Sequence, residues 1–211
     1  MTENLANPDL SSRVLGPAVQ QNISLEQFLH RYGSEKRRKM VQPVYRDMLG
    51  EARELIRPLS LYRVFDAGDV PQFADFLPGA RSVMLGICSI GTRLDERVEA
   101  LSEGKLAYAV VLDEIGTAMV LELGNQMYQH VRMWAHGIGW RTSPSYRPGI
   151  GRWPLELQHD IFRALHAGDF DLRMGESLQI LPQKTVSMIV GIGPDLKVRR
   201  IPVQLYRGSP N

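Results

Sequence analysis

The residues best suited to binding a ligand lie between positions 141 and 158, in a segment that begins with an arginine. Arg141 offers a planar guanidinium that can hold a carboxylate through two parallel hydrogen bonds, and Tyr146 adds an aromatic edge with a hydroxyl. Prolines and glycines, Gly149 among them, hold this backbone in a non-repetitive path and leave main-chain N–H and C=O groups free to bind something. The segment therefore predicts a binding loop for a carboxylate. The alternative is a long surface loop that prolines and tryptophans pin to the core.

Glu122 is the second residue whose position suggests chemistry. On helical spacing it shares a stripe with Val111, Ile115 and Ala118, inside a segment that is apolar on nearly every face. A carboxylate there is costly to desolvate unless a cation meets it. The partner of the carboxylate would be an internal arginine, a helix-end amide or the ammonium of a bound ligand. With a ligand, an amino-acid-like molecule would lie between Arg141, for its carboxylate, and Glu122, for its ammonium.

The sequence lacks the common motifs for nucleotide binding, for serine hydrolases and for metal binding. The three Gly-x-Gly pairs lack the third glycine of a dinucleotide fingerprint, and no Walker-type phosphate loop or Gly-x-Ser-x-Gly elbow occurs. The five histidines lie far apart and have no cysteine beside them, so we predict no metal site. The single cysteine, Cys88, excludes an intramolecular disulfide and lies in an apolar run, as a buried inert thiol would. No general base is evident, and we predict no catalytic residue.

Composition narrows the class of protein. The 211 residues are 44% hydrophobic and 23% charged, which fits one soluble globular domain, and a net charge of +2 argues against a nucleic-acid partner. The N-terminus does not resemble a signal peptide, and acidic residues interrupt the most apolar stretch, 106–123. We therefore expect no membrane span and a cytoplasmic protein. The basic run 36–39 is interpreted as a solvated helix face, with a docking patch for an acidic partner as the alternative.

Predicted helices and strands are interspersed along the chain, and they must position the residues named above. Residues 1–22 are expected to be a flexible tail and residues 23–211 a single domain. Hydrophobic periodicity and breakers predict helices at about 25–33, 40–56, 93–101, 105–134 and 154–167, and strands at 61–65, 82–89, 178–181, 185–190 and 197–205. Residues 82–89 are almost continuously apolar, as in a central strand. Without a regular βαβ period, this order predicts an α+β fold with a twisted, largely antiparallel sheet flanked by helices.

Two blocks of the sequence resemble a known family. An Arg-x-x-Pro-x-Tyr core appears as Arg141, Pro144 and Tyr146, and residues 143–158 continue a Ser-Pro-x-Tyr-x-Pro-Gly-x-Gly-x-Trp-Pro-Leu-Glu-x-Gln pattern. Residues 182–191 match a second pattern, Pro-x-Lys-Ser/Thr-Val-Ser-x-Ile-x-Gly. In these blocks the chain resembles the activation (reactivation) domain of cobalamin-dependent methionine synthase, and more closely the free-standing activation-domain-like proteins of bacteria. The likeness extends over about residues 24–195.

The resemblance implies binding of S-adenosylmethionine (SAM) and repair of an inactive corrinoid. In that family the domain docks over an oxidised cobalamin, a flavodoxin-like or iron–sulfur protein supplies an electron, and SAM supplies a methyl group. It implies Arg141 for the SAM carboxylate, Ser143 through its backbone, Tyr146 beside the ligand and the corrinoid face, and Glu122 as an acidic contact. Gly149 belongs to the same predicted cofactor-binding loop. The chain lacks the Asp-x-His-x-x-Gly signature for cobalamin, so a corrinoid protein or methionine synthase modules would act in trans.

The chain also departs from the family. A second acidic contact precedes the family's arginine, whereas residues 134–138 here are Trp-Ala-His-Gly-Ile. Three hypotheses remain open on the sequence alone. The chain is a SAM-binding accessory that supports reactivation of a corrinoid protein, a degenerate fold that acts as a binding or structural module without SAM, or an enzyme for another amino-acid-like substrate.

Overall fold

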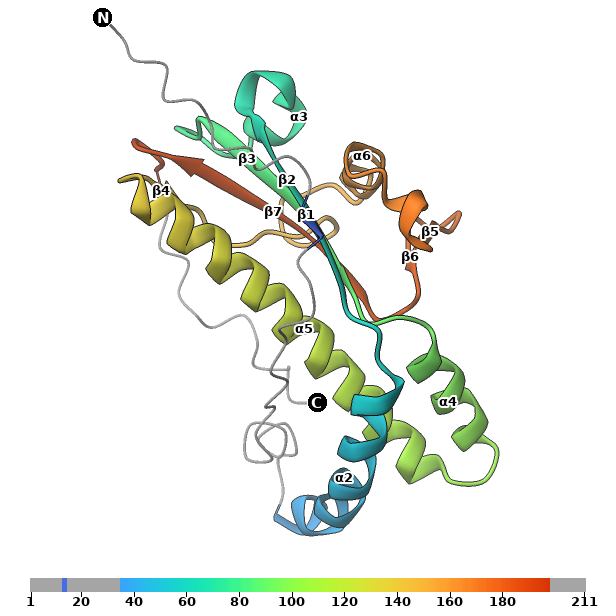
Figure 1. Ribbon diagram of the computed structural model, residues 1–211. Helices are drawn as coiled ribbons and strands as arrows, with labels where there is room; N and C mark the ends of the chain where they lie inside the picture. Colours follow the sequence, from blue (N-terminus) through green and yellow to red (C-terminus); the bar gives the residue numbers. More distant parts are fainter. Residues whose placement is uncertain (1–12, 15–34, 198–211) are drawn as a thin grey trace, which may run out of the picture.

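The fold is a twisted antiparallel sheet with helices on both faces, seen here in a computed structural model that describes residues 13–14 and 35–197 (Figure 1). The described strands of the main sheet lie in the order β1-β2-β3-β7-β4, and every pairing is antiparallel. Their bounds are β1 Arg13–Val14, β2 Leu59–Asp66, β3 Ser82–Ser89, β4 Arg141–Thr142 and β7 Thr185–Gly193. A separate hairpin pairs β5 Arg173–Met174 with β6 Ile180–Leu181. The predicted α+β class is confirmed.

Strand β3 is the middle of the sheet, as its apolar run predicts. All eight of its residues are buried, because β2 and β7 cover its two edges and helices cover its two faces. Its side chains alternate between two cores. Met84 and Cys88 enter the core on one face, whereas Val83, Leu85 and Ile87 enter the core on the other.

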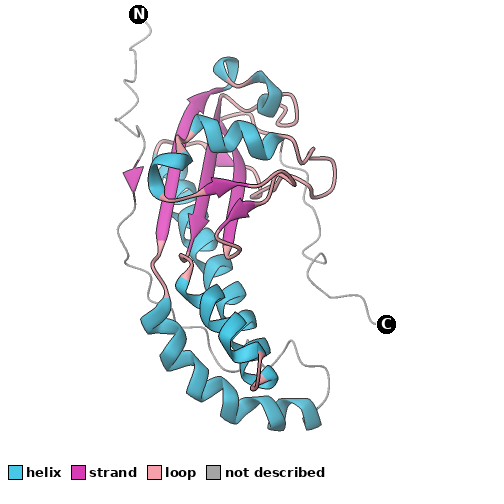
Figure 2. Ribbon diagram, turned by 90° about the vertical axis from the view of Figure 1, so that its right-hand side faces the viewer, coloured by secondary structure: helices cyan, strands magenta, loops and turns pink. Residues whose placement is uncertain are grey.

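The first face of the sheet is covered by the long helix α5 Leu106–Gly137, with α2 Glu35–Leu55 and α4 Arg93–Ser102 packed beside it. Helix α5 has 32 residues and is therefore about 48 Å long, much longer than the strands. Figure 2 shows its excess length and α2 extending beyond the end of the sheet. Thirteen of its side chains or glycines are buried, from Ala109 to Ala135, so burial and not intrinsic propensity stabilises it.

The opposite face is covered by shorter elements, α3 Pro71–Ala74, α6 Leu157–Ala164 and the β5–β6 hairpin (Figure 1). Their core contains Phe73, Trp153 and Ile161, all at most 3% exposed. The predicted helix at 154–167 is shorter than expected. His166 takes the left-handed φ of 49°, which ends the helical path before a short 3-10 turn at Ala167–Phe170.

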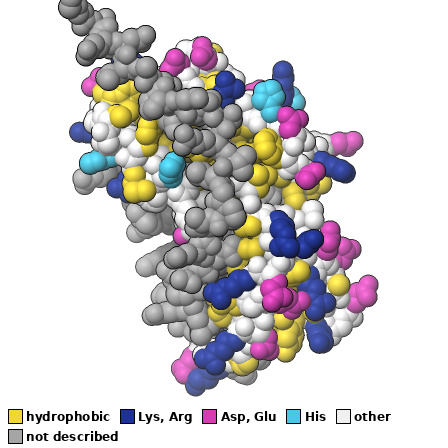
Figure 3. Space-filling view, in the orientation of Figure 1, with side chains coloured by type: hydrophobic (Ala, Val, Ile, Leu, Met, Phe, Trp, Pro, Cys, Tyr) yellow, Lys and Arg dark blue, Asp and Glu magenta, His cyan; other side chains and the backbone are white. Residues whose placement is uncertain are grey.

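Other expectations differ in detail. Helix α2 begins at Glu35 instead of about residue 40 and so contains the basic run 36–39. Its exposed Lys39 pairs with Glu35 at 2.8 Å. On the side of the molecule seen in Figure 3, basic and acidic side chains are interspersed over the lower half. Arg13 and Val14 lie within the expected tail yet pair with β2. The expected helix at 25–33 falls outside the described residues, as does nearly all of the strand expected at 197–205.

No helix in the described ranges combines the length and the apolarity that crossing a bilayer would require. The charged residues expected to interrupt the most apolar stretch lie along α5. Asp113 and Glu122 there are partly exposed.

Candidate functional site

A cavity of about 760 Å³ lies where the C-terminal part of α5 meets the edge strand β4. Its walls combine aromatic, basic and polar side chains. The lining residues are Tyr128, Gln129, Arg132, Met133, His136, Gly137, Trp140, Arg141, Thr142 and Pro144. Such a surface can hold a ligand that carries both a planar ring and an anionic group. Arg141, which the sequence analysis predicts to bind a carboxylate, is part of this wall.

The chain reverses direction tightly between α5 and β4, and this reversal creates the cavity. After Gly137 the amides of Gly139 and Trp140 donate to the carbonyl oxygens of His136 and Ala135, at 3.0 and 2.9 Å. Gly139 has a φ of 77°, which other residues rarely adopt. Residues 141–143 then run back along β7, so that exposed Arg141 lies beside the last turns of α5.

Ser143 is buried and holds this returning segment in place. Its amide donates to the carbonyl oxygen of Gly191 at 2.8 Å, and its hydroxyl oxygen accepts from the Gly191 amide at 2.9 Å. Its carbonyl oxygen accepts from the Tyr128 hydroxyl at 3.0 Å. The backbone groups predicted to meet a ligand are therefore already used, and only the second lone pair of that carbonyl remains for one.

Glu122 does not line this cavity. Its Oε1 accepts a hydrogen bond from Gln126 at 3.3 Å, and the side chain is half-buried. It precedes the lining residue Gln129 by seven residues, about 10 Å along the helix. Of the two residues predicted to hold an amino-acid-like ligand, Arg141 lines the cavity and Glu122 does not.

Tyr146 and Gly149 lie with the core on the opposite face of the sheet. The Tyr146 ring stacks on Trp153 at 5.0 Å between centroids, and Trp153 stacks on Phe76 at 4.9 Å. Burial raises the pKa of the Tyr146 hydroxyl, which keeps it protonated as a potential donor. Gly149 has a φ of 78°, and its amide donates to the Trp153 carbonyl oxygen at 2.9 Å, so a tight turn accounts for this glycine. Neither residue is among those that line the cavity.

Nine of the ten lining residues were not among the predicted site residues, and four of these nine carry aromatic or basic groups: Tyr128, Arg132, His136 and Trp140. The first three follow each other at intervals of four on α5, so they share one helical stripe. A polar stripe on the last turns of an otherwise apolar helix, directly before Arg141, is the signal that could have revealed them. Trp140 already stood out as a flank of the loop.

A second group of charges lies at the start of β7, away from this cavity. Lys184 is only 7% exposed, and its Nζ lies 2.6 Å from Asp113 Oδ1 and 3.7 Å from Asp95 Oδ1. Asp95 also accepts a hydrogen bond from the Gln183 amide at 3.1 Å. Burial raises the pKa of Asp95, although the nearby Lys184 ammonium opposes this effect. The cluster joins α4, α5 and the start of β7, so the ion pairs of Lys184 account for its burial within the fold.

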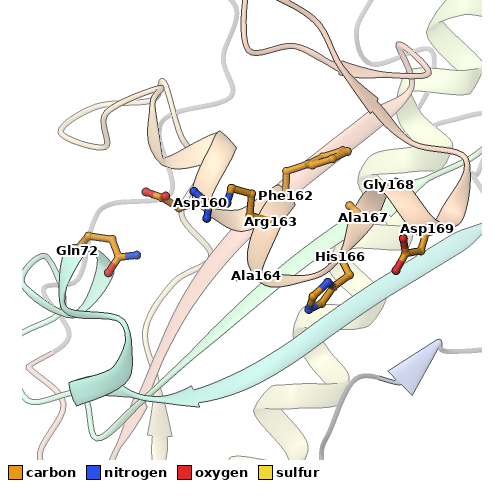
Figure 4. Close-up of a pocket in the computed structure, with 9 residues that line it drawn as sticks. All are labelled: Gln72, Asp160, Phe162, Arg163, Ala164, His166, Ala167, Gly168 and Asp169. Atoms are coloured by element: carbon orange, nitrogen blue, oxygen red, sulfur yellow. The ribbon is translucent and has the colours of Figure 1, made fainter.

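Another cavity, of about 610 Å³, lies between α3 and α6 (Figure 4). Arg163, His166, Asp160 and Asp169 contribute charged or titratable groups to its rim. In Figure 4 these side chains are spread along the rim instead of converging on one point. Within residues 13–14 and 35–197 there is no group of three or more His, Cys, Asp or Glu residues arranged to hold a metal ion. We regard the cavity beside β4 as the candidate ligand site.

No family model matches this chain, and no curated protein matches it. Among solved structures, the crystal structure of the MetH reactivation domain bound to AdoHcy is similar, with a TM-score of 0.62 and 13% sequence identity. The likeness covers 82% of this chain and 70% of that chain. At this identity it shows the fold alone: the chain has the fold of the MetH reactivation domain. The resemblance drawn from the two sequence blocks is confirmed at that level.

Proposed function

We propose that the chain binds a SAM-type ligand in the cavity beside β4 and supports reductive methylation of a corrinoid protein that acts in trans. One observation carries the proposal: in a chain with the reactivation-domain fold, Arg141 lies exposed in the wall of a cavity that also contains aromatic side chains. The similar solved domain binds AdoHcy, the demethylated form of SAM. A cytoplasmic location, a methionine synthase or other corrinoid methyltransferase as client, and a flavodoxin-like or iron–sulfur electron donor belong to the same proposal.

The lining residues fit the parts of such a ligand. The guanidinium of Arg141 would hold the α-carboxylate through paired hydrogen bonds. Tyr128 and Trp140 offer ring surfaces for the adenine, and Gln129 and Thr142 offer polar groups for the ribose hydroxyls. The volume of about 760 Å³ is within the usual range for small-molecule sites.

SAM supplies a methyl group that its sulfonium already activates, so the residues of this chain need not move protons. They bind the amino-acid end, orient the ligand along the wall of α5 and exclude water from one side of it. Positioning of this kind can account for most of the rate acceleration that a protein gives to the transfer of an activated group. The corrinoid would be presented by the partner at the open side of the cavity.

Calorimetric titration with S-adenosylhomocysteine and with SAM tests the binding step. We expect saturable binding that Arg141→Ala weakens about tenfold to a hundredfold, because a charged hydrogen-bonded pair contributes about 1.5–3 kcal/mol. Arg173→Ala is the matched control, since Arg173 is also exposed on a two-residue strand but does not line the cavity. If the wild type gives no binding heat with either ligand, the proposal is contradicted.

A transfer assay tests the proposed role. The readout is labelled methyl moved from SAM to a corrinoid protein in the presence of a reductant, with and without the wild-type chain. We expect the chain to increase the transfer and Arg141→Ala to abolish most of the increase. Equal transfer with and without the chain would leave only the binding function.

A second candidate function is a binding or structural module that has lost SAM. Two observations favour it. No carboxylate is among the described residues that line the cavity, and the backbone groups of Ser143 are already paired within the fold. A rise in melting temperature on addition of either ligand would exclude this alternative, because a ligand that binds the native state stabilises it.

A further inference from the structure

The charged side chains that line the cavity beside β4 all have one sign. They are Arg132 and Arg141, and none of the described residues in its wall is an aspartate or a glutamate. No ion pair among the described side chains involves Arg132 or Arg141. Arg132 instead donates to the neutral amide oxygen of Gln129 at 3.2 Å. Both guanidinium charges therefore act on whatever occupies the cavity.

The end of helix α5 offers little to offset this charge. The C-terminal carbonyl groups of a helix attract cations when they are free. Here the Ala135 carbonyl oxygen accepts from the amides of Ile138 and Trp140, and the His136 carbonyl oxygen accepts from Gly139. Glu122, which could have supplied a negative charge, lies about two turns before Gln129. Among the described residues that line the cavity, none therefore offers a carboxylate to a cationic ligand atom.

We infer that the cavity selects S-adenosyl ligands by charge and binds the thioether S-adenosylhomocysteine more tightly than the sulfonium SAM. The inference rests on the proposed function, because it concerns the same cavity. Both ligands carry an α-carboxylate and an α-ammonium, so Arg141 can hold either one. Only SAM carries a third charge, and this positive charge would lie in a wall that contains two arginines and no carboxylate. Two repulsive interactions at roughly 8 Å in a solvent-open site lower affinity by about three- to tenfold.

This selection gives the protein a regulatory property. Occupancy would follow the ratio of the demethylated product to the methyl donor. A fall in the concentration of the thioether, for example through its hydrolysis, would raise the fraction of cavities that hold SAM.

The experiment compares dissociation constants of the full chain for S-adenosylhomocysteine, SAM and sinefungin. Sinefungin replaces the sulfonium with an amine-bearing carbon, so it keeps the positive charge without the reactive methyl group. We expect S-adenosylhomocysteine to bind about three- to tenfold more tightly than the other two at low salt. In about 1 M salt, where the screening length falls to about 3 Å, the difference should shrink toward zero.

Two variants of one exposed side chain test the cause. Arg132→Gln should reduce the preference for the thioether, and Arg132→Glu should abolish or reverse it; melting temperatures show that both variants are folded. Equal or tighter binding of SAM by the wild type, or an unchanged preference in Arg132→Glu, would overturn the inference while leaving the proposed function intact. Failure of all three ligands to bind would overturn the proposed function and the inference with it.

Discussion

The hydroxyl of Tyr128 donates a 3.0 Å hydrogen bond to the carbonyl oxygen of Ser143. This bond joins the end of the long helix α5 to the segment that carries Arg141, across the base of the candidate ligand cavity. The orientation of the arginine therefore depends on a contact between side chain and backbone, in addition to the two residue pairs that join β4 to β7.

Replacing Tyr128 by phenylalanine should weaken ligand binding more than it weakens the fold. The ring remains in the wall, but the segment loses one hydrogen bond, worth about 1 kcal/mol. We expect affinity for S-adenosylhomocysteine to fall about threefold to fivefold, measured by calorimetry, with a small decrease in melting temperature. Tyr108→Phe, on the same helix but far from the cavity, is the control. Unchanged affinity in Tyr128→Phe would show that Arg141 is positioned without this bond.

Lys184→Met should destabilise the fold without affecting the cavity. Methionine keeps most of the volume, but the carboxylates of Asp113 and Asp95 would lose the ammonium between α5 and α4. We expect a loss of about 2–3 kcal/mol in the free energy of unfolding by urea, because the carboxylates remain partly exposed to water. Replacing both aspartates by asparagine in the same variant should recover part of the loss. A single variant as stable as the wild type would contradict the assigned role.

Asp95 should give the stability a specific pH dependence. Burial raises its folded-state pKa above the ordinary 3.8, so the folded protein binds this proton more tightly than the unfolded chain. The stabilisation from the protonated form is complete below pH 3.8 and is lost as the pH rises through the folded pKa. Lys184 and Asp113 face the same group, and the lysine limits the size of the effect.

The measurement for Asp95 is the difference in unfolding free energy between Asp95→Asn and the wild type at several pH values. Asparagine can still accept the hydrogen bond from the Gln183 amide. We expect the difference to shift in favour of the variant as the pH rises from about 4 toward neutrality. A shift in the opposite direction would mean that the ion pair with Lys184 outweighs burial.

Trp153 links the predicted binding loop to the core. Its replacement by alanine should lower the stability of the fold far more than its replacement by phenylalanine. Its ring lies between Tyr146 and Phe76, and its buried Nε1 has no hydrogen-bond partner in the described structure. Trp153→Ala should cost about 3–5 kcal/mol, since it leaves a large cavity. Trp153→Phe should cost much less, because it keeps an aromatic ring and removes the unpaired N–H. Thermal and urea unfolding distinguish the two, and equal losses would argue against this account of the stack.

The sheet and the long helix were predictable because their signals are local and strong. Residues 82–89 form an almost continuous apolar run, and residues 105–134 keep a helical period, so β3 and α5 appear nearly as expected. Strand β1 could not be predicted, because two paired residues, Arg13 and Val14, carry no periodic signal.

The candidate site was predictable only in part. Arg141 was found because its guanidinium and the prolines after it are adjacent in sequence. Glu122 was expected beside the same ligand and does not line the cavity, since the sequence pattern does not reveal where a long helix ends relative to a cavity. Arg132 and His136 enter the wall only because the chain folds back after Gly137. Such a reversal depends on tertiary contacts that no local pattern specifies.

Strand β4 has only two paired residues and lies at the border of the sheet. Separating Arg141 and Thr142 from β7 would leave the ladder between β3 and β7 complete, with all eight of its residue pairs. Local opening at this border should consequently need far less free energy than global unfolding. Arg141 and Thr142 can thus open locally while Ser143 stays bonded to Gly191 and the rest of the molecule stays native, and the amide protons of these two residues should exchange with solvent well before those of the central strand.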